Sequence, residues 1–263
     1  MSMDTAIIEI NNISKNFGGL AALQQVSIAV QRGSITAVIG PNGAGKTTLI
    51  KILATLLTKD SGRVEVLGYD IDTDPEAVRH LVGYVGQDTE RSAYARLTVV
   101  ENLRFCGKLR GLTSHLIADQ IDILATQFDF HATLGKLFVT LSGGQKQTVV
   151  IMRALLHDPP VVFLDEPTKG LDPIIAKRIR TFLRQLVSEN GRSLLLTSHV
   201  LSEVDELADR VALIHQGRIP VSGTPRQLKS NLGAAEFVEI EQAALPRSTQ
   251  EKILQLEPVL FRM

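Results

Sequence analysis

The sequence has little of several features that mark special environments. Its 263 residues contain one cysteine, Cys106, so no disulfide can form within the chain. Its 28 basic and 28 acidic side chains cancel to a formal net charge of zero, which excludes the global field that draws proteins onto nucleic acid or anionic lipid. It has no uncharged apolar run as long as a bilayer span. Any contact with a membrane is therefore expected to pass through a protein partner.

The N-terminal region does not show the pattern of a secretory signal peptide. Residues 1–9 show no basic stretch followed by an apolar core, so a cytosolic or peripheral protein is expected. Cys106 stands in an apolar, helical-looking stretch and is interpreted as a buried small hydrophobic residue, not a reactive thiol. Hydrophobic residues make up 44% of the chain, enough for one large core or a core with a small lobe.

Short β-branched runs alternate with longer helical patterns along the chain. Strands are expected at 26–30, 34–39, 82–85, 161–164, 193–197 and 211–215, and helices at 47–57, 142–157, 173–189 and 201–208. The later strands are nearly continuous apolar runs, which are typical of strands covered by helices on both faces. These patterns predict an α/β fold with a largely parallel core sheet.

The N-terminal part has a different pattern. Residues 7–10 and 26–30 alternate polar and apolar side chains, and Asn16-Phe17-Gly18-Gly19 lies between them, which predicts antiparallel, hairpin-like pairing. Residues 98–128 have a helical pattern without a strand. We therefore expect an N-terminal antiparallel β-layer and a helical insert in addition to the α/β core.

These patterns also suggest domain boundaries. Residues 5–232 are expected to form one domain, with the helical insert at about 88–140. Residues 233–263 are expected to form a short α+β tail, with a strand at 235–241 and a helix at 247–256.

A phosphate-loop pattern follows the strand expected at 34–39. It reads Gly40-Pro41-Asn42-Gly43-Ala44-Gly45-Lys46-Thr47, continues with Thr48 and opens a helix. The glycines let backbone N–H groups converge on phosphate oxygens at the positive end of that helix. Lys46 is expected to reach the β- and γ-phosphates, and the Thr47 hydroxyl to ligate Mg²⁺. The alternative is a glycine-rich turn that only packs.

Two adjacent acids end the apolar strand expected at 161–164. Asp165 and Glu166 stand where open α/β sheets bind ligands, at the carboxyl ends of the strands. Asp165 suits Mg²⁺ coordination, directly or through water. Glu166 suits polarising an attacking water, because phosphoryl transfer requires mainly positioning and charge stabilisation. The alternative is a pair of solvated or helix-capping acids.

A second glycine-rich segment reads Leu141-Ser142-Gly143-Gly144-Gln145. Ser142 is a good N-cap for the helix that follows, so the glycines are expected at an exposed helix start with free N–H donors. Such a helix end attracts anions, but this segment is not part of the phosphate loop that would hold a phosphate there. This segment therefore predicts an anion site that requires a ligand held elsewhere.

This pentapeptide, the phosphate loop and Val161-Val162-Phe163-Leu164-Asp165-Glu166-Pro167-Thr168 together resemble the ATP-binding-cassette family. The resemblance covers about residues 8–232. It implies a P-loop NTPase core and an ATP hydrolase with Mg²⁺, in which two copies close head to tail around two nucleotides. Ser142, Gly143, Gly144 and Gln145 would then face the γ-phosphate that the other copy holds. Half of each ATP site would be missing from the monomer.

Other family positions match in order. Phe17 resembles the aromatic that stacks on adenine, Gln87 resembles the glutamine that touches Mg²⁺ and water, and His199 resembles the histidine that contacts the γ-phosphate and holds Glu166 and the water. Their alternatives are a core aromatic, a turn glutamine and an ordinary strand-end histidine. Gly170-Leu171-Asp172 resembles the loop that crosses the dimer interface. The other histidines show no metal-ligand spacing.

The segments at 97–103 and 223–228 look most like ATPase subunits of bacterial exporters of drugs, polyketide antibiotics or polysaccharides. One position departs from the family. Thr148 stands where the family usually has an arginine, which puts the local polar network and turnover in doubt but not nucleotide binding.

The resemblance implies the ATPase subunit of an exporter, a homodimer or paired cassette that works with separate membrane-spanning subunits on the cytoplasmic face of the membrane. The insert, including Tyr94 and Phe105, is a candidate surface for those subunits, unless these side chains pack inside it. One rival is a cassette ATPase acting on nucleic acid or the ribosome, but a neutral single cassette lacks the basic extensions of such relatives, so no nucleic acid is expected. Another rival is a module that binds ATP without hydrolysing it, and retention of Lys46, Asp165, Glu166 and His199 argues against it.

Overall fold

The computed structural model describes residues 6–89 and 93–231. The strand and helix expected at 235–241 and 247–256 lie outside the described residues. The chain divides into two compact units, Met1–Leu228 and Lys229–Met263. The architecture and the site below concern the first unit.

The core of this unit is a six-stranded sheet with the strand order β10-β9-β3-β8-β7-β6. Its strands are β3 (Ile35–Ile39), β6 (Val82–Val85), β7 (Val161–Asp165), β8 (Ser193–Ser198), β9 (Arg210–His215) and β10 (Arg218–Gly223). All neighbouring pairs are parallel except β9 and β10. Every residue of β3, β7 and β8 is buried, as their continuous apolar sequences predict.

A second, antiparallel sheet has the order β2-β1-β4-β5 and confirms the expected N-terminal layer. Its strands are β1 (Ala6–Phe17), β2 (Leu20–Gln31), β4 (Ser61–Val66) and β5 (Tyr69–Asp70). The turn between β1 and β2 uses Gly18 and Gly19, both with positive φ. The strands expected at 7–10 and 26–30 were too short, because cross-strand pairing extends them past the apolar stretches. Strands β4, β5 and β10 were not predicted.

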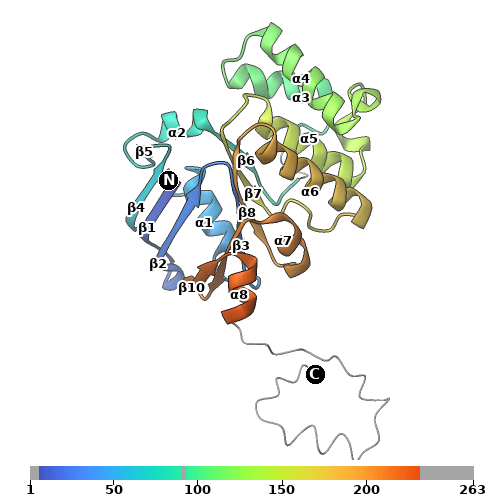
Figure 1. Cartoon of the computed structure of the whole chain (residues 1–263). Coiled ribbons are helices and arrows are strands. Elements are labelled where there is room, and N and C mark those ends of the chain that lie inside the picture. The colour runs from blue at the N-terminus through green and yellow to red at the C-terminus, as the bar shows by residue number, and fades with distance from the viewer. Residues whose placement is uncertain (1–5, 90–92, 232–263) are drawn as a thin grey trace, which may run out of the picture. The chain divides into compact units, whose positions relative to one another are not determined.

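Helices cover the core sheet on both faces (Figure 1). The helices of the described residues are α1 (Lys46–Leu53), α2 (Pro75–Leu81), α3 (Val99–Leu109), α4 (Ser114–Phe128), α5 (Gly143–Leu155), α6 (Pro173–Ser188), α7 (Leu201–Leu207) and α8 (Pro225–Asn231), with 3₁₀ turns η2 (His131–Thr133) and η3 (Phe138–Thr140). Helices α3 and α4 confirm the helical insert. Helix α1 ends before the predicted residue 57, and Thr55 just beyond it has a φ of 58°. Helix α2 was not predicted.

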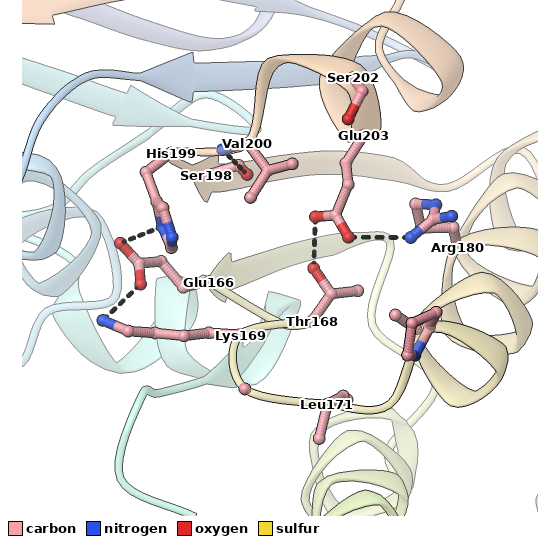
Figure 2. A pocket seen from close by; sticks show the side chains of 13 residues that line it. Glu166, Thr168, Lys169, Leu171, Arg180, Ser198, His199, Val200, Ser202 and Glu203 are labelled. Atoms are coloured by element: carbon pink, nitrogen blue, oxygen red, sulfur yellow. Dashed lines mark hydrogen bonds and ion pairs between the residues drawn. The ribbon is translucent and has the colours of Figure 1, made fainter. Parts of the chain in front are cut away.

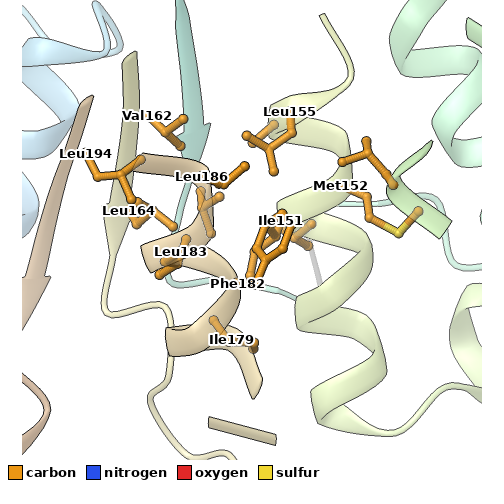
Figure 3. Close-up of a cluster of buried hydrophobic side chains, with 14 of the residues drawn as sticks. Ile151, Met152, Leu155, Val162, Leu164, Ile179, Phe182, Leu183, Leu186 and Leu194 are labelled. Atoms are coloured by element: carbon orange, nitrogen blue, oxygen red, sulfur yellow. The ribbon is translucent and has the colours of Figure 1, made fainter. Parts of the chain in front are cut away.

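The buried apolar residues form two clusters, one on each face of the core sheet. Phe163 and Leu195 belong to the cluster that α1 shares with the antiparallel sheet. Val162 and Leu194 point the other way, toward α5 and α6 (Figure 3). This alternation follows from the strand repeat of two residues. It fixes the core strands between α1 with the antiparallel sheet on one face and α5 with α6 on the other. Because the strands other than β10 are parallel, their carboxyl ends share one edge.

Cys106 is only half-buried, so the prediction of a buried residue was wrong in degree. Its side chain lines a surface groove beside α3. Among the described residues, no helix combines the length and apolar character that crossing a membrane would need.

Candidate functional site

The phosphate loop (residues 40–48) connects β3 to α1, as predicted, and two of its glycines are required by close backbone contacts. A Cβ on Gly40 would lie 2.1 Å from the Ile214 carbonyl oxygen, and one on Gly45 would lie 2.5 Å from the Ala22 carbonyl oxygen. Gly45 also has a φ of 108° at the N-cap of α1. The loop is therefore held in a shape that only glycine permits at these positions, with the start of α1 at its end.

Lys46 is almost completely buried, and its ammonium lies across the loop. It donates to the carbonyl oxygens of Gly40 and Pro41, at 2.7 and 3.1 Å. It also lies 3.5 Å from Glu166 Oε1. In a phosphate loop the lysine at this position reaches the phosphates that the backbone N–H groups of the loop cradle.

The three residues predicted for Mg²⁺ meet at one point. Gln87 Nε2 donates to Thr47 Oγ1 at 2.9 Å and to Asp165 Oδ1 at 3.2 Å. Asp165 is buried, and its Oδ2 has no hydrogen-bond partner in the described part of the chain. A hydroxyl, an amide and a buried carboxylate fit Mg²⁺, which commonly takes one or two carboxylates and completes its shell with water and substrate phosphates.

No cluster of three or more histidine, cysteine, aspartate or glutamate side chains with metal-binding geometry occurs within residues 6–89 and 93–231.

Glu166 follows β7 in a strained conformation, with a φ of 51°. Its N–H donates to Thr197 Oγ1 at 2.9 Å, and Thr197 Oγ1 donates to Asp165 Oδ1 at 2.6 Å. Asp165 and Thr197 are paired in the register of β7 and β8. One buried hydroxyl therefore fixes both the turn at Glu166 and the orientation of Asp165.

The Glu166 side chain, 3% exposed, lies among three basic residues. Figure 2 shows two of them, His199 and Lys169. Glu166 Oε1 is 3.4 Å from His199 Nδ1 and 3.5 Å from Lys46 Nζ, and its Oε2 is 2.7 Å from Lys169 Nζ. Burial acts to raise the pKa of this carboxyl, but the hydrogen bond and charge of Lys169, together with Lys46 and His199, lower it below its ordinary value. Glu166 is therefore ionised at neutral pH.

A pocket of about 380 Å³ opens beside Glu166 and His199. On its other side, Thr168 Oγ1 donates to Glu203 Oε2 at 2.6 Å, and Arg180 Nη1 pairs with Glu203 Oε1 at 2.8 Å (Figure 2). Glu203 belongs to α7 and Arg180 to α6. The segment after Glu166 is thus tied to both helices.

The segment predicted to face a second copy, the 142–145 turn, caps α5 as expected. Ser142 Oγ accepts from the N–H of Gln145 at 3.3 Å, and Gln145 Oε1 accepts from the N–H of Ser142 at 3.0 Å. Ser142 and Gly143 are exposed. Among the described residues, no hydrogen bond or ion pair joins this turn to the phosphate loop, Asp165, Glu166 or His199. Within one chain it stands apart from the rest of the predicted site.

Phe17 ends β1 and is 46% exposed, so the alternative of a core aromatic is wrong. Lys15 Nζ lies 5.5 Å from the centre of its ring. An exposed ring face at the end of a strand is available for stacking.

The helical insert has an exposed aromatic pair. Tyr94 and Phe105 are 55% and 39% exposed, with ring centres 4.9 Å apart at 83°. They do not pack inside the insert. A groove of about 790 Å³ runs along α3, lined in part by Arg79, Arg110 and Leu109.

Sequence reasoning missed two residues of this site. Thr197 stands at the end of an apolar strand, and its role depends on the pairing of β8 with β7, which the sequence does not specify. Lys169 stands three residues after Glu166, and this spacing was the available signal. Its N–H donates to the Glu166 carbonyl oxygen at 3.1 Å, which closes a turn and brings the two side chains together.

Comparisons with known proteins agree with this geometry. A family model described as "ABC transporter" matches residues 23–169. The chain is 38% identical over 230 residues to a daunorubicin resistance ATP-binding protein of Streptomyces coeruleorubidus, covering 88% of this chain and 72% of that protein. It is 34% identical over 216 residues to a bacitracin transport ATP-binding protein of Bacillus licheniformis, covering 82% and 69%. The solved structure of cbiO1 from Clostridium perfringens, part of an ABC transporter complex, matches with a TM-score of 0.78 at 28% identity, covering 86% of this chain and 92% of that one.

Proposed function

The chain belongs to the ABC transporter family of ATP-binding proteins, and on this premise we propose how its residues bind and hydrolyse ATP to power export. The resemblance inferred from the motifs is confirmed, and so is the ATP-hydrolase class. The observation that carries the proposal is the convergence of Thr47, Gln87 and Asp165 beside an ionised Glu166.

The phosphate loop holds the polyphosphate, with Lys46 at the β- and γ-phosphates and Phe17 against adenine. Thr47, Gln87 and Asp165 would hold Mg²⁺, and the ion would supply positive charge for the phosphate oxygens. Glu166 Oε1 orients a water for in-line attack on the γ-phosphorus and takes its proton, while ADP leaves. His199, next to the same oxygen, keeps the carboxylate and the water in place.

We assign the 142–145 turn to the nucleotide of a second copy. Two features support this assignment. Gly143 is exposed at the helix start, and a Cβ added to it would meet nothing within 4 Å in its own chain. This glycine is therefore not required by packing within the chain, whereas close approach of a phosphate oxygen would require it. A head-to-tail pair of copies places the turn of each against the phosphate loop of the other.

The partners that transmit the work are proposed to be separate membrane-spanning subunits, with this chain on the cytoplasmic face. The groove along α3 supports this proposal, because Arg79, Arg110 and Arg153 line it beside the exposed side chain of Leu109. The groove also has apolar residues and one acid, Glu76, so its three arginines give it an excess of positive charge that suits an amphipathic segment with acidic side chains. Tyr94 and Phe105 expose further apolar surface on the same insert.

The cargo is proposed to be a small molecule such as an antibiotic or a drug, or a polymer. Relatives carry names that refer to daunorubicin resistance and to bacitracin transport, two unlike compounds. Similar ATPases that serve unlike compounds indicate that cargo contacts lie in the membrane subunits. The same relatives favour transport over a role on nucleic acid or the ribosome.

The decisive experiment replaces the proposed base. Glu166→Gln keeps the size of the side chain but removes the charge, so turnover is expected to fall by roughly 10²–10⁴ while ATP binding persists. The variant should accumulate as an ATP-bound dimer in size-exclusion chromatography with Mg²⁺. Glu189→Gln, an exposed acid at the end of α6, is the matched control. Wild-type turnover in Glu166→Gln would remove this carboxylate from the mechanism.

A further inference from the structure

We propose that Lys169 is a positioning residue for hydrolysis: it anchors Glu166 Oε2, so that Oε1 faces the phosphate loop. This inference rests on the proposed function of Glu166. It concerns a residue that none of the sequence motifs singled out. Its basis is how the two oxygens of one buried carboxylate are divided between different elements.

The contacts of the two oxygens differ in direction. Oε1 lies 3.5 Å from Lys46 of the phosphate loop and 3.4 Å from His199 at the end of β8. Oε2 lies 2.7 Å from Lys169, which comes from the loop leading into α6 (Figure 2). The closest of the three contacts is therefore on the oxygen that faces away from the phosphate loop. This leaves Oε1 on the side where a γ-phosphate and its water would lie.

The carboxylate needs such an anchor. The backbone of Glu166 is fixed by its positive φ and by the hydrogen bond from its N–H to Thr197. These constraints stop at the backbone, however, and the terminal torsion of a glutamate is broad and weakly restrained. Without a partner on Oε2, rotation about that torsion would move both oxygens, and the acceptor beside Lys46 and His199 would leave its position. An attacking water would then lose a fixed acceptor, and catalysis is sensitive to errors of this size.

Lys169 is itself held in place. Its N–H donates to the Glu166 carbonyl oxygen at 3.1 Å, and the neighbouring Thr168 is bonded to Glu203 at 2.6 Å. Gly170, with a φ of 70°, turns the chain directly afterwards. The Lys169 side chain is 48% exposed, whereas Glu166 is 3% exposed. Removing the lysine should therefore affect the carboxylate more than the fold.

The test compares Lys169→Met with wild type in steady-state ATP hydrolysis. Methionine keeps much of the stem but removes the ammonium, so kcat is expected to fall about 10-fold, with KM for ATP unchanged. Lys169→Arg, which keeps a cation beside Glu166 Oε2, should restore kcat. Lys177→Met removes an exposed lysine of α6 and is the charge-matched control.

Several outcomes would overturn the inference. An unchanged kcat in Lys169→Met would show that the ion pair is incidental, and a rise in kcat would show that Lys169 restrains Glu166. Should Lys169→Met unfold in a thermal melt, Lys169→Gln is measured in its place under the same criteria. Glu166→Gln in parallel separates the two proposals. If that variant keeps turnover, the proposed function of Glu166 fails. If it loses turnover while Lys169→Met behaves as wild type, only the role of Lys169 fails.

Discussion

The two glycine-rich segments of this protein have similar composition but differ in what surrounds them. The phosphate loop is enclosed by its own chain: Gly40 and Gly45 contact neighbouring backbone, and Lys46 is buried beside Glu166. The 142–145 turn is exposed, and a Cβ on Gly143 would meet nothing in its own chain. The fold requires glycine at positions 40 and 45 of the first segment. In the second segment a Cβ on Gly144 would lie 2.8 Å from Ile175 Cγ2, whereas nothing in the chain requires glycine at position 143.

The difference also appears in the polar contacts. Around Glu166, the predicted catalytic and metal-binding side chains are joined by hydrogen bonds or ion pairs within one chain. At the turn, Ser142 and Gln145 satisfy each other, and the first N–H groups of a helix have no partner within the helix itself. One half of the ATP site is assembled by folding, and the other half is expected to be assembled by association. The following predictions test this division.

The largest effect is expected at the exposed half. Ser142→Glu places a negative charge where the phosphate of another copy is expected, so turnover should fall at least 10²-fold while the monomer still binds ATP. Thr113→Glu removes the comparable N-cap of α4 and controls for the loss of a cap. Fluorescent-nucleotide binding and phosphate release measure the two properties separately. Weaker nucleotide binding by the Ser142→Glu monomer would mean that the turn contacts its own ATP.

Mixing variants sharpens the same comparison. Lys46→Ala and Ser142→Glu are each expected to be inactive alone. A mixed dimer keeps one intact site, so an equal mixture should regain up to about a quarter of wild-type turnover, because half of the dimers are mixed. A completely inactive mixture would contradict independent sites. Full activity would contradict shared sites.

A smaller effect is expected inside the enclosed half. Thr197→Val removes the hydroxyl that bonds Asp165 and the Glu166 N–H, which should lower the free energy of unfolding by about 1–3 kcal/mol. Turnover should fall with it, because the positions of both acids change. Thr36 is a matched control, since it is equally buried in the core sheet and its hydroxyl has no partner among the described residues. Chemical denaturation should find Thr36→Val neutral or slightly stabilising, and equal losses in the two variants would contradict the prediction.

The contact between the C-terminal end of α5, which begins at the exposed turn, and β6, which leads to Gln87 in the enclosed half, should respond to pH. His157 follows α5, and its Nε2 lies 3.0 Å from the Val82 carbonyl oxygen at the start of β6. Burial and the nearby Arg110 charge lower the pKa of His157 to about 4. Because the folded state disfavours the protonated ring, the stabilising contribution is complete above about pH 6.5 and is lost as pH falls toward 4. The expected loss in unfolding free energy is on the order of 1–3 kcal/mol.

Urea unfolding at pH 7 and pH 5 measures this effect. His157→Gln should be less stable than wild type at pH 7 and should lose less stability on acidification. His115→Gln, which removes an exposed histidine of α4, should keep the wild-type dependence on pH. Parallel curves for wild type and His157→Gln would show that another group is responsible.

The smallest effect is expected at Thr148, the position where the family usually has an arginine. Thr148 is buried in α5, and its Oγ1 donates to the Gly144 carbonyl oxygen at 3.0 Å. It therefore supports the turn from within the helix. Thr148→Val should cost about 1 kcal/mol or less, with turnover within about two-fold of wild type. A large loss of turnover with unchanged stability would show that this hydroxyl acts on the site.

The sequence by itself determined the layers of the fold and most of the site. Continuous apolar runs predicted the buried strands β7 and β8. Motif spacing placed Lys46 at the start of α1 and Asp165 and Glu166 at the carboxyl end of β7. These features are local, because a strand, a glycine turn and a helix start depend on nearby residues. The short edge strand β5 was missed because nearby residues do not specify it. Its hydrogen bonds to β4 come from tertiary pairing.

Only the tertiary structure decided which residues meet. Thr197 reaches Asp165 because β8 pairs with β7 in one register, and Gln87 reaches Thr47 across forty positions of sequence. The division of the Glu166 oxygens between Lys46 and Lys169, and the exposure of Tyr94 and Phe105, likewise follow from packing. Sequence patterns specify the local conformation and the solvent preference of a segment. Contacts between distant segments depend on strand register and helix packing, which are settled only when the whole core is buried.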